Sequence, residues 1–543
     1  MKKSKTRVLQ TIYKNLQQDV KNKNIMDQAM HSHEGSGIFS INSLKERRLC
    51  RYLLTGFRIF QLIVVLMVFT SHAEASVHLP AFFSDHMVLQ TGRPVPVWGT
   101  ANPQERVSVV IGGQTKTTDA KQDGTWSVTL DPLSPGEILT LTVQGSNTII
   151  IHDVLVGEVW LCSGQSNMEL RVSKAMNFTT EQKAATWPEI RMLQGEKWVV
   201  CSPQTVGDFS AAAYFFGREL HQNLKLPVGL INRSSGGTPI ELWTSLEAQK
   251  DVPELKPILE TYGEDTSASA EDAKQAASDR KQATEVEGKK AVATQKVSPG
   301  YLFNNRILPL APYAIRGVIW YQGEANSYTT HANLYGIQLA AMIKNWRQLW
   351  GYDFAFISVQ LPDIGSPQTE PCQTCGRVLV REGVLKSLSL TNTGMAVTIG
   401  TGEEKSNHPK NKQEVGRRLA LWALAKVYNQ KDVAASGPLP ESNQVVDGKV
   451  VITFSNTDGG LVVHGGGALK GFAIAGADMK WVWGKATISG NTVIVSSPEV
   501  TAPVAVRYAW ASNPASSNLY NGVGLPATPF RTDNEPLSNA YLH

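Results

Sequence analysis

Short stretches that alternate between hydrophobic and polar residues occupy two separate parts of the chain. Over residues 76–153 the segments VSVVIG, TWSVTL and LTLTVQ alternate with a period of two and are separated by Gly, Pro, Asp and Asn. This pattern is typical of a β-sandwich, in which each strand buries one face and exposes the other. The pattern returns over residues 432–543, in KVVITF, TVIVSS and VAVRYAW, and predicts a second β-sandwich-like domain.

Residues 154–431 have a different pattern, in which continuous apolar runs alternate with helical stretches. The runs VLVGEVWLC, VGLIN, GVIWYQG, FISVQLP and GMAVTIG have the composition of strands buried on both faces. Amphipathic stretches such as YGIQLAAMIKNWRQLW separate them. Repeated strand and helix predict an α/β domain with a mostly parallel sheet. A polar stretch at about 247–297 is expected to be a solvated helical insertion in this domain.

The first 75 residues are typical of a leader that directs export. Basic residues, including Arg47 and Arg48, precede the apolar run 59–70, and Ala73-Glu74-Ala75 supplies the small residues of a cleavage site. The run is too short to span the roughly 30 Å of membrane hydrocarbon, although an uncleaved anchor is the alternative. We expect removal of residues 1–75, a periplasmic or extracellular location, and no stable membrane span afterwards.

Composition and charge narrow the class of protein further. The chain has 543 residues, of which 42% are hydrophobic and 18% charged, as in globular proteins with more than one core. After residue 75 there are 40 basic and 42 acidic residues, so the mature chain has no basic surplus. Nucleic-acid binding needs such a surplus on one face, and we therefore expect no nucleic-acid partner.

The cysteines are too few for a disulfide scaffold. Beyond the leader they are Cys162, Cys201, Cys372 and Cys375. The Cys372-x-x-Cys375 pair has a spacing that allows a small disulfide in an exported protein, and one isolated pair argues against a structural zinc site. Cys162 ends an apolar strand and is expected to be a buried small hydrophobe.

Candidate catalytic residues follow four of the predicted strands. Ser166 lies in GEVWLCSGQSN, directly after a buried strand, and the carboxyl ends of such strands are where ligands bind. A serine there can present its hydroxyl to a substrate while its backbone N–H stabilises an oxyanion, although it also suits a helix N-cap. His408 precedes a predicted helix that begins near Asn411 and can act as a base, cap the helix or lie on the surface.

The two blocks between them contain candidate hydrogen-bond donors. In GLINRSSGGTPIELW, Gly236 and Gly237 allow a backbone amide to approach a substrate oxygen, or form an ordinary turn. In GVIWYQGEANS, Gln322 has an amide that can donate to an oxyanion, and Glu324 can orient a base or bind a sugar hydroxyl. A serine, amide donors and a late histidine are together the parts that acyl transfer requires, with no metal and no cofactor.

Four blocks carry a family resemblance. LCSGQSNMEL, SSGGTPIELW, IWYQGEANS and HPKNKQEVGRRLA, with the opening LPAFFSDHMVLQ, resemble the sialate O-acetylesterase family and its acetylxylan-esterase relatives among the SGNH hydrolases. The resemblance implies an SGNH-type, flavodoxin-like three-layer α/β/α hydrolase domain flanked by β-sandwich domains. It implies a secreted carbohydrate O-acetylesterase acting on 9-O-acetyl sialate, with acetylated xylan as the alternative substrate.

Residue roles follow from the same resemblance. Ser166 is expected to be the nucleophile and His408 the base, and the oxyanion hole is expected to combine Ser166, Gly236 and Gln322, with Gly237 as an equal candidate for the glycine. The predicted ligands of the acetylated sugar or glycan are Asn167, Asn326 and Arg233. A basic residue suits the carboxylate of sialic acid, and Arg171 is the alternative to Arg233 for that role.

One departure from the family pattern concerns the group that orients the histidine. The family usually has an aspartate before the His-Pro pair, whereas TIGTGEEKSNHP has Lys405 three residues before His408. Glu324 is the first candidate for the orienting acid, Glu403 and Glu404 are others, and a Ser–His dyad held by a backbone carbonyl is a further possibility. A carbohydrate-binding protein on a weakened esterase scaffold is therefore the alternative function.

Overall fold

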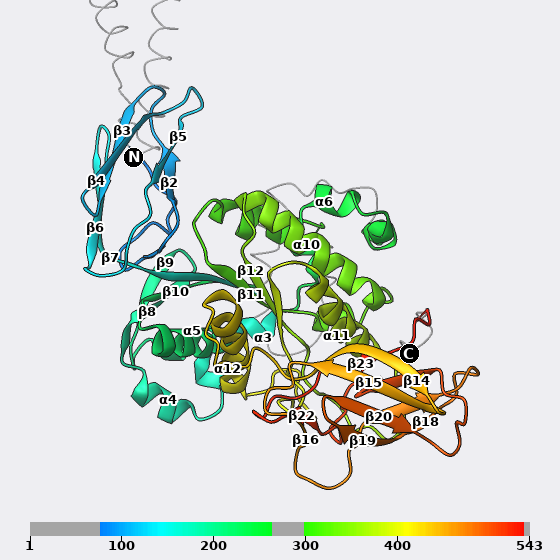
Figure 1. Cartoon of the computed structure of the whole chain (residues 1–543). Coiled ribbons are helices and arrows are strands. Elements are labelled where there is room, and N and C mark those ends of the chain that lie inside the picture. Colours follow the sequence, from blue (N-terminus) through cyan, green and yellow to red (C-terminus); the bar gives the residue numbers. More distant parts are fainter. Residues whose placement is uncertain (1–76, 263–297, 537–543) are drawn as a thin grey trace, which may run out of the picture. The chain divides into compact units, whose positions relative to one another are not determined.

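A computed structural model describes residues 77–262 and 298–536 of the chain (Figure 1). The predicted leader, its cleavage site and residues 263–297 of the predicted insertion lie outside the described residues. In the two described ranges, no helix is both long enough and apolar enough to cross a membrane.

Short strands form the first part of the described chain, and they pair antiparallel except for β1, which is fully buried and pairs in parallel with β7. β3 pairs with β4 and β6, and β2 pairs with β5. Along β5, buried Trp126, Val128 and Leu130 alternate with exposed residues, which is the periodicity predicted from TWSVTL. The strands are β1 (Val88–Gln90), β2 (Val95–Thr100), β3 (Arg106–Ile111), β4 (Gln114–Asp119), β5 (Thr125–Leu130) and β6 (Leu139–Gln144).

β7 (Thr148–Gly164) is a 17-residue strand that continues from this region into the central sheet. Its first part pairs antiparallel with β6, and its second part pairs in parallel with β10 and β11. Burial changes along it from alternating to complete, as expected where a strand passes from a sheet with one buried face to a sheet with two. The predicted boundary between residues 153 and 154 therefore falls inside one unbroken strand.

The central sheet has the strand order β13-β12-β11-β7-β10-β8-β9. Its strands are parallel except for β9, which pairs antiparallel with β8. β11 and β12 are completely buried, in agreement with the apolar runs that predicted them. The strands are β8 (Trp187–Gln194), β9 (Lys197–Cys201), β10 (Val228–Ser234), β11 (Gly317–Tyr321), β12 (Ala355–Val359) and β13 (Thr393–Ala396).

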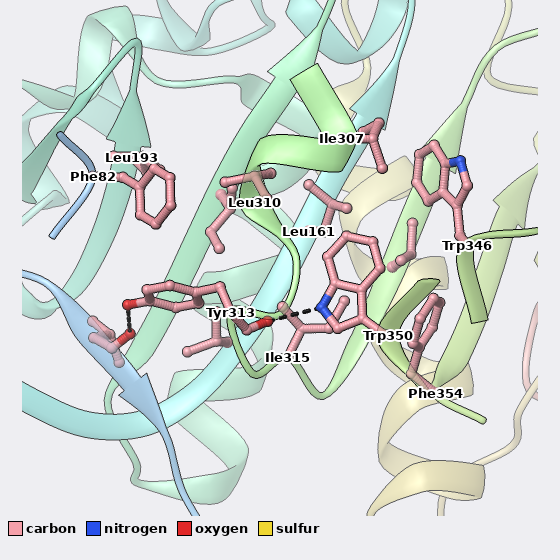
Figure 2. Packing of buried hydrophobic residues seen from close by; sticks show 14 of the residues in the cluster. Phe82, Leu161, Leu193, Ile307, Leu310, Tyr313, Ile315, Trp346, Trp350 and Phe354 are labelled. Carbon is pink, nitrogen blue, oxygen red and sulfur yellow. Dashed lines mark hydrogen bonds between the residues drawn. The ribbon is translucent and has the colours of Figure 1, made fainter. Parts of the chain in front are cut away.

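Alternate residues of β7 pack into two different hydrophobic clusters. Trp160 and Cys162 lie in a cluster with α5 and α12, whereas Leu161 lies in a cluster with α10. Figure 2 shows the second cluster, in which the Trp350 indole nitrogen donates to the Tyr313 carbonyl at 2.9 Å. Cys162 is fully buried, as predicted.

Helices of very different length connect these strands. The α-helices are α3 (Ser166–Glu169), α4 (Phe178–Ala184), α5 (Ala211–Leu224), α6 (Leu246–Lys250), α7 (Lys256–Glu260), α9 (Glu324–Ser327), α10 (Tyr335–Trp350), α11 (Gly376–Lys386) and α12 (Lys412–Trp422). The shorter 3-10 and π turns are η1 (Val172–Lys174), η2 (Val206–Asp208), η3 (Ile240–Trp243), η4 (Pro253–Leu255), η5 (Phe303–Ile307), η6 (Leu308–Leu310), η7 (Ala332–Leu334), η8 (Ser387–Ser389) and η9 (Ala423–Val427).

Antiparallel sheets with one shared hydrophobic core form the last part of the described chain. The sheets are β14-β15-β20-β19, β18-β17-β21-β23 and β16-β22. The strands are β14 (Leu439–Val446), β15 (Lys449–Ser455), β16 (Leu461–Val463), β17 (Phe472–Ala475), β18 (Trp481–Trp483), β19 (Lys485–Ser489), β20 (Thr492–Ser496), β21 (Ala505–Tyr508), β22 (Leu519–Asn521) and β23 (Phe530–Arg531).

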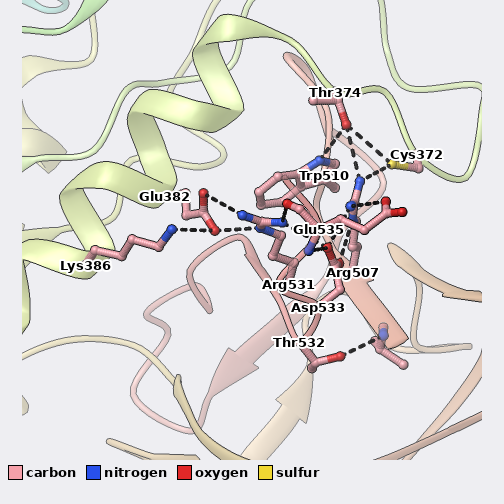
Figure 3. Close-up of polar contacts among 11 residues, drawn as sticks. Cys372, Thr374, Glu382, Lys386, Arg507, Trp510, Arg531, Thr532, Asp533 and Glu535 are labelled. Atoms are coloured by element: carbon pink, nitrogen blue, oxygen red, sulfur yellow. Dashed lines mark hydrogen bonds and ion pairs between the residues drawn. The ribbon is translucent and has the colours of Figure 1, made fainter. Parts of the chain in front are cut away.

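A buried charge network joins these sheets to α11 and to the loop before it (Figure 3). The Arg507 guanidinium donates to both carboxylate oxygens of Asp533, at 2.8 and 2.9 Å, and Arg531 pairs with Glu382 of α11 at 2.6 Å. Arg507 also donates to the sulfur of Cys372 at 3.1 Å. Among the described cysteines, Cys372 and Cys375 are both free thiols, which corrects the predicted small disulfide.

Candidate active site

The ends of three neighbouring strands lie at one level of the central sheet. Gly164, which ends β7, is in register with Ser234 of β10 and with Tyr321 of β11. A Cβ atom on Gly164 would lie only 2.1 Å from the Tyr321 carbonyl oxygen. The backbone angle φ of Gly164 is also positive, at 134°, which other residues rarely adopt, so this position requires glycine. The predicted blocks that follow the three strands therefore begin side by side.

Ser166 and His408 meet at this edge of the sheet. The Ser166 Oγ lies 2.7 Å from the His408 Nε2, although the residues are 242 positions apart in the chain. Ser166 is the first residue of α3, and the residue at the N-cap position is Gln165. The helix-cap alternative for Ser166 is therefore not what the structure shows. When the imidazole carries its proton on Nδ1, Nε2 is free to accept the proton of the serine hydroxyl.

The Glu324 carboxylate contacts the residue after Ser166 and not the imidazole. Its Oε1 accepts a short hydrogen bond from the Asn167 amide nitrogen, and its Oε2 has no partner within the described part of the chain. Glu403 instead accepts from the backbone N–H of Lys410 at 2.7 Å. Among the residues that the structure describes, no carboxylate hydrogen-bonds to His408, which corrects the expected direct contact from Glu324.

Asn167 and Lys412 hold the backbone on both sides of His408. The Asn167 Nδ2 donates to the Asn407 carbonyl oxygen at 2.8 Å, and the Lys412 Nζ donates to the Pro409 carbonyl oxygen at 2.7 Å. Lys412 also donates to the Asn167 Oδ1 at 2.7 Å. Burial lowers the pKa of Lys412 to about 7, although the nearby Glu324 and Glu403 carboxylates act in the opposite direction.

Of the two predicted glycines, Gly236 is the one beside the serine. A Cβ on Gly236 would lie 3.5 Å from the Ser166 Cβ, whereas a Cβ on Gly237 would meet none of the described atoms within 4 Å. The Gly236 N–H donates to the Glu169 carboxylate at 2.8 Å. This backbone donor therefore faces an anionic oxygen next to Ser166, as an oxyanion donor does.

Gln322, the third predicted member of the oxyanion hole, is fully buried. Its amide nitrogen lies within hydrogen-bond distance of three acceptors, namely Gln165 Oε1 at 3.1 Å, the Thr238 carbonyl at 3.1 Å and Asn326 Oδ1 at 2.7 Å. Donation to a substrate oxyanion would require at least one of these bonds to be exchanged. Its role as an oxyanion donor stays a prediction.

The predicted sugar ligands use their polar groups inside the protein. Asn167 is fully buried in the contacts given above. Asn326 accepts from Gln322 and donates to Glu241 at 3.0 Å, and the Arg233 guanidinium donates to the Gly195 carbonyl at 2.6 Å. These bonds give all three residues a structural role, and sugar binding by them stays a prediction. The alternative cation, Arg171, is exposed and pairs with Asp208 at 3.0 Å.

Sequence reasoning missed several residues around the serine and histidine. Glu169 and Lys412 both lie within the recognised blocks, so their spacing from Ser166 and His408 was the available signal. Tyr328 directly follows the third block, has 72% of its surface exposed, and its hydroxyl oxygen accepts from the Asn407 amide nitrogen at 3.2 Å. An exposed aromatic ring next to the histidine loop is a natural surface for the apolar face of a sugar.

Comparisons with known proteins agree on one family. Residues 156–275 and 301–425, which include Ser166 and His408, match a family described as carbohydrate esterase, sialic acid-specific acetylesterase. The chain is 31% identical to the sialate O-acetylesterase of Homo sapiens, over 83% of this chain and 91% of that protein. It is 30% identical to the sialate O-acetylesterase of Pongo abelii, over 84% of this chain and 93% of that protein. A solved carbohydrate acetylesterase from Xanthomonas citri matches with a TM-score of 0.73 and 35% identity, over 84% of this chain and 100% of that one.

Proposed function

The chain belongs to the sialate O-acetylesterase family and is a carboxylic ester hydrolase of carbohydrates, and we propose that it removes O-acetyl groups with Ser166 as nucleophile and His408 as base. The observation that carries the proposal is the 2.7 Å contact between the Ser166 Oγ and the His408 Nε2. The proposal includes an SGNH-type, flavodoxin-like three-layer hydrolase domain, and the two hydrophobic clusters on the faces of β7 support it.

The proposed reaction has two acyl-transfer steps. His408 Nε2 takes the proton from Ser166 Oγ while Oγ attacks the acetyl carbonyl carbon, and the N–H groups of Ser166 and Gly236 stabilise the oxyanion. The intermediate breaks its bond to the sugar oxygen, which leaves with the proton from His408. Water then attacks the acetyl carbonyl carbon while His408 takes its proton, the bond from this carbon to Ser166 Oγ breaks, Oγ regains the proton from His408, and acetate is released. Glu169 must release the Gly236 N–H before that group can serve the oxyanion.

No carboxylate among the described residues hydrogen-bonds to the imidazole, and we therefore propose a Ser–His dyad. In triads the third residue fixes the tautomer and stabilises the imidazolium, and its loss lowers kcat by up to about 10⁴-fold. The alternative function, sugar binding on a weakened esterase scaffold, follows from the same observation. The direct Ser166–His408 contact favours the enzyme, because binding alone has no need for it.

For the substrate, we propose the acetyl group of 9-O-acetylated sialic acid. The curated relatives given above carry the name sialate O-acetylesterase, which supports this choice. The exposed Tyr328 ring next to the histidine loop supports a sugar substrate in general. Acetylated xylan is the alternative, and the same exposed ring would suit it too.

Acetate release from a panel of acetylated sugars tests the proposal. The panel contains 9-O-acetyl-N-acetylneuraminic acid, acetylated xylo-oligosaccharides and acetylated pectin, with Ser166→Ala as the matched blank. We expect the sialate to give the highest kcat/KM. The Ser166→Ala variant should release no acetate above the background rate. Preference for xylo-oligosaccharides would overturn the choice of sugar, and no release from any acetylated sugar would overturn the esterase assignment.

We also propose that the chain is exported and that its leader is removed after Ala75. The support is the sequence pattern of basic residues, apolar run and Ala-x-Ala site in residues 45–75. Intact mass measured on protein from the native host, with fractionation of the cells, tests it. A mature N-terminus near Ala75 in an exported fraction is expected, and an intact Met1 in the cytoplasmic fraction contradicts it.

A further inference from the structure

Lys412 is a lysine in a place where lysines are rarely found. It is the first residue of α12, and its side chain has 0% of its surface exposed. Burial of an ammonium group is costly unless hydrogen bonds and a counter-charge compensate it. Its two hydrogen bonds, to Asn167 Oδ1 and to the Pro409 carbonyl, are both 2.7 Å long, and its nitrogen lies 5.3 Å from the centre of the Tyr321 ring.

The counter-charge of Lys412 is the Glu324 carboxylate, and Asn167 links the two side chains. The Asn167 amide accepts from Lys412 at its oxygen and donates to the Glu324 carboxylate at its nitrogen. When the Lys412 amine is protonated, a single buried amide is polarised between a cation and an anion, which strengthens both hydrogen bonds. We call this chain of three side chains the Lys412–Asn167–Glu324 bridge.

The bridge connects the nucleophile segment to the base segment. Asn167 directly follows Ser166 and donates to the carbonyl of Asn407, which directly precedes His408. Lys412 donates to the carbonyl of Pro409, which directly follows His408. The backbone of the histidine is therefore held on one side by Asn167, which adjoins the serine, and on the other side by Lys412, which is hydrogen-bonded to Asn167.

We infer that the Lys412–Asn167–Glu324 bridge sets the position of His408 relative to Ser166, and that Lys412 is a positioning residue for acyl transfer. The inference rests on the proposed function of these two residues. In a triad, a carboxylate holds the imidazole itself. Here the bridge holds the peptide units on both sides of the imidazole, so that Nε2 stays within reach of the serine without an aspartate.

Replacement of Lys412 by methionine tests the inference, with Lys410→Met as the matched control. Methionine keeps much of the apolar stem and removes the donor, whereas the Lys410 side chain is exposed in the same turn. We expect Lys412→Met to lower kcat for a small acetyl ester by about tenfold or more with KM changed less than about twofold, because misplacement of the base affects the transition state more than substrate binding. Lys410→Met should change neither value by more than about twofold.

A second variant separates positioning from stability. Lys412→Met alone leaves Glu324 buried without its counter-charge, which lowers thermal stability, whereas Lys412→Met with Glu324→Gln removes both charges and should recover part of the lost Tm. The Pro409 carbonyl still lacks its donor in the double variant, so kcat should stay low. If Lys412→Met has wild-type kcat, or if kcat in the double variant recovers together with Tm, Lys412 is structural only and the inference is wrong.

The labelling rate of Ser166 by a fluorophosphonate distinguishes failure of the inference from failure of the proposed function. If wild type is not labelled at Ser166, the proposed nucleophile is wrong. If wild type is labelled, the labelling rate of Lys412→Met should be lower by about tenfold or more, because His408 must also activate Ser166 in this reaction. Equal labelling rates in the two proteins contradict the inference, whatever the natural substrate.

Discussion

Gly416 of α12 is predicted to be a position where a single methyl group destabilises the protein. A Cβ there would lie 2.5 Å from the Phe215 Cβ and 2.6 Å from the Phe216 backbone nitrogen of α5. Carbon atoms pack at about 3.5–4.0 Å, so α5 and α12 would have to separate by about an ångström. The backbone of a helix cannot rotate away as a flexible side chain can.

Two opposing effects decide the size of the change. Alanine in place of glycine within a helix raises the free energy of unfolding by about 0.5–1 kcal/mol. An extra methyl group in a well-packed core lowers the free energy of unfolding by about 1–3 kcal/mol. We therefore expect Gly416→Ala to lower the free energy of unfolding by about 1–2 kcal/mol. Because α12 begins at Lys412, the same displacement should also lower kcat for an acetyl ester.

Urea unfolding of Gly416→Ala, with the esterase assay at the same temperature, measures both effects. Gly476→Ala is the matched control, because the nearest atom to a Cβ there is the Ala502 carbonyl oxygen at an ordinary 3.5 Å. The control should be unchanged or slightly more stable. If Gly416→Ala is as stable as wild type or more stable, the close packing of α5 against α12 is not as described.

Three further changes test other parts of the account. Gly236→Ala should leave Tm nearly unchanged, because the only close contact of the new methyl group is Glu169 Oε2 at 2.9 Å and that flexible side chain can move, but it should lower kcat/KM for an acetyl ester about tenfold or more, because the methyl group takes up space beside Ser166 where the oxyanion would form; wild-type kcat/KM would contradict this. Arg507→Met should lower the free energy of unfolding by about 3 kcal/mol, measured in urea, because it leaves the buried Asp533 with one fewer cation; a loss below about 1 kcal/mol would refute it. The pKa of Lys412 is about 7 in the folded protein, against an ordinary value of 10.5 in the unfolded chain, so between these pH values the unfolded chain binds more protons. The free energy of unfolding of wild type relative to Lys412→Met should therefore rise with pH in this window, by at most about 1.4 kcal/mol per pH unit, and a flat difference would argue against the low pKa.

The sequence was sufficient to predict which segments meet at the site. Ser166, Gly236 and Gln322 each follow an apolar run, and parallel strands place their carboxyl ends at one edge, so their proximity followed from the order of the elements. The block around His408 left its role open, and the base was predicted from the four blocks together and their resemblance to the family; the structure brings its Nε2 to 2.7 Å from Ser166 Oγ.

The direction of individual side chains could not be predicted in this way. Gly323 has φ 143, and a Cβ there would lie 2.6 Å from a side-chain carbon of Val380, so the chain makes a turn that only glycine fits. That turn places Glu324 at the start of α9, where it contacts Asn167 and not the imidazole. The periodicity of a strand gives no information on the path that the chain takes after the strand ends.

A long-range contact and the length of one strand are two further features that the local pattern did not predict. The sulfur of Cys372 lies against Arg507, a residue 135 positions later, and local spacing alone had suggested a bond to Cys375. At residue 153 the change of pattern marks a change from one buried face to two, and not the end of a strand, because β7 continues to Gly164. The division into domains at this point stays a prediction.

The kcat of Ser166→Ala on a small acetyl ester decides whether Ser166 is the nucleophile. The Ser166 hydroxyl faces His408 and is only half buried, so the variant should keep the wild-type Tm. We expect kcat to fall by about 10³-fold or more, as on removal of a nucleophile from other serine hydrolases. A folded variant that keeps more than about a tenth of the wild-type kcat would contradict the assignment of Ser166 as nucleophile.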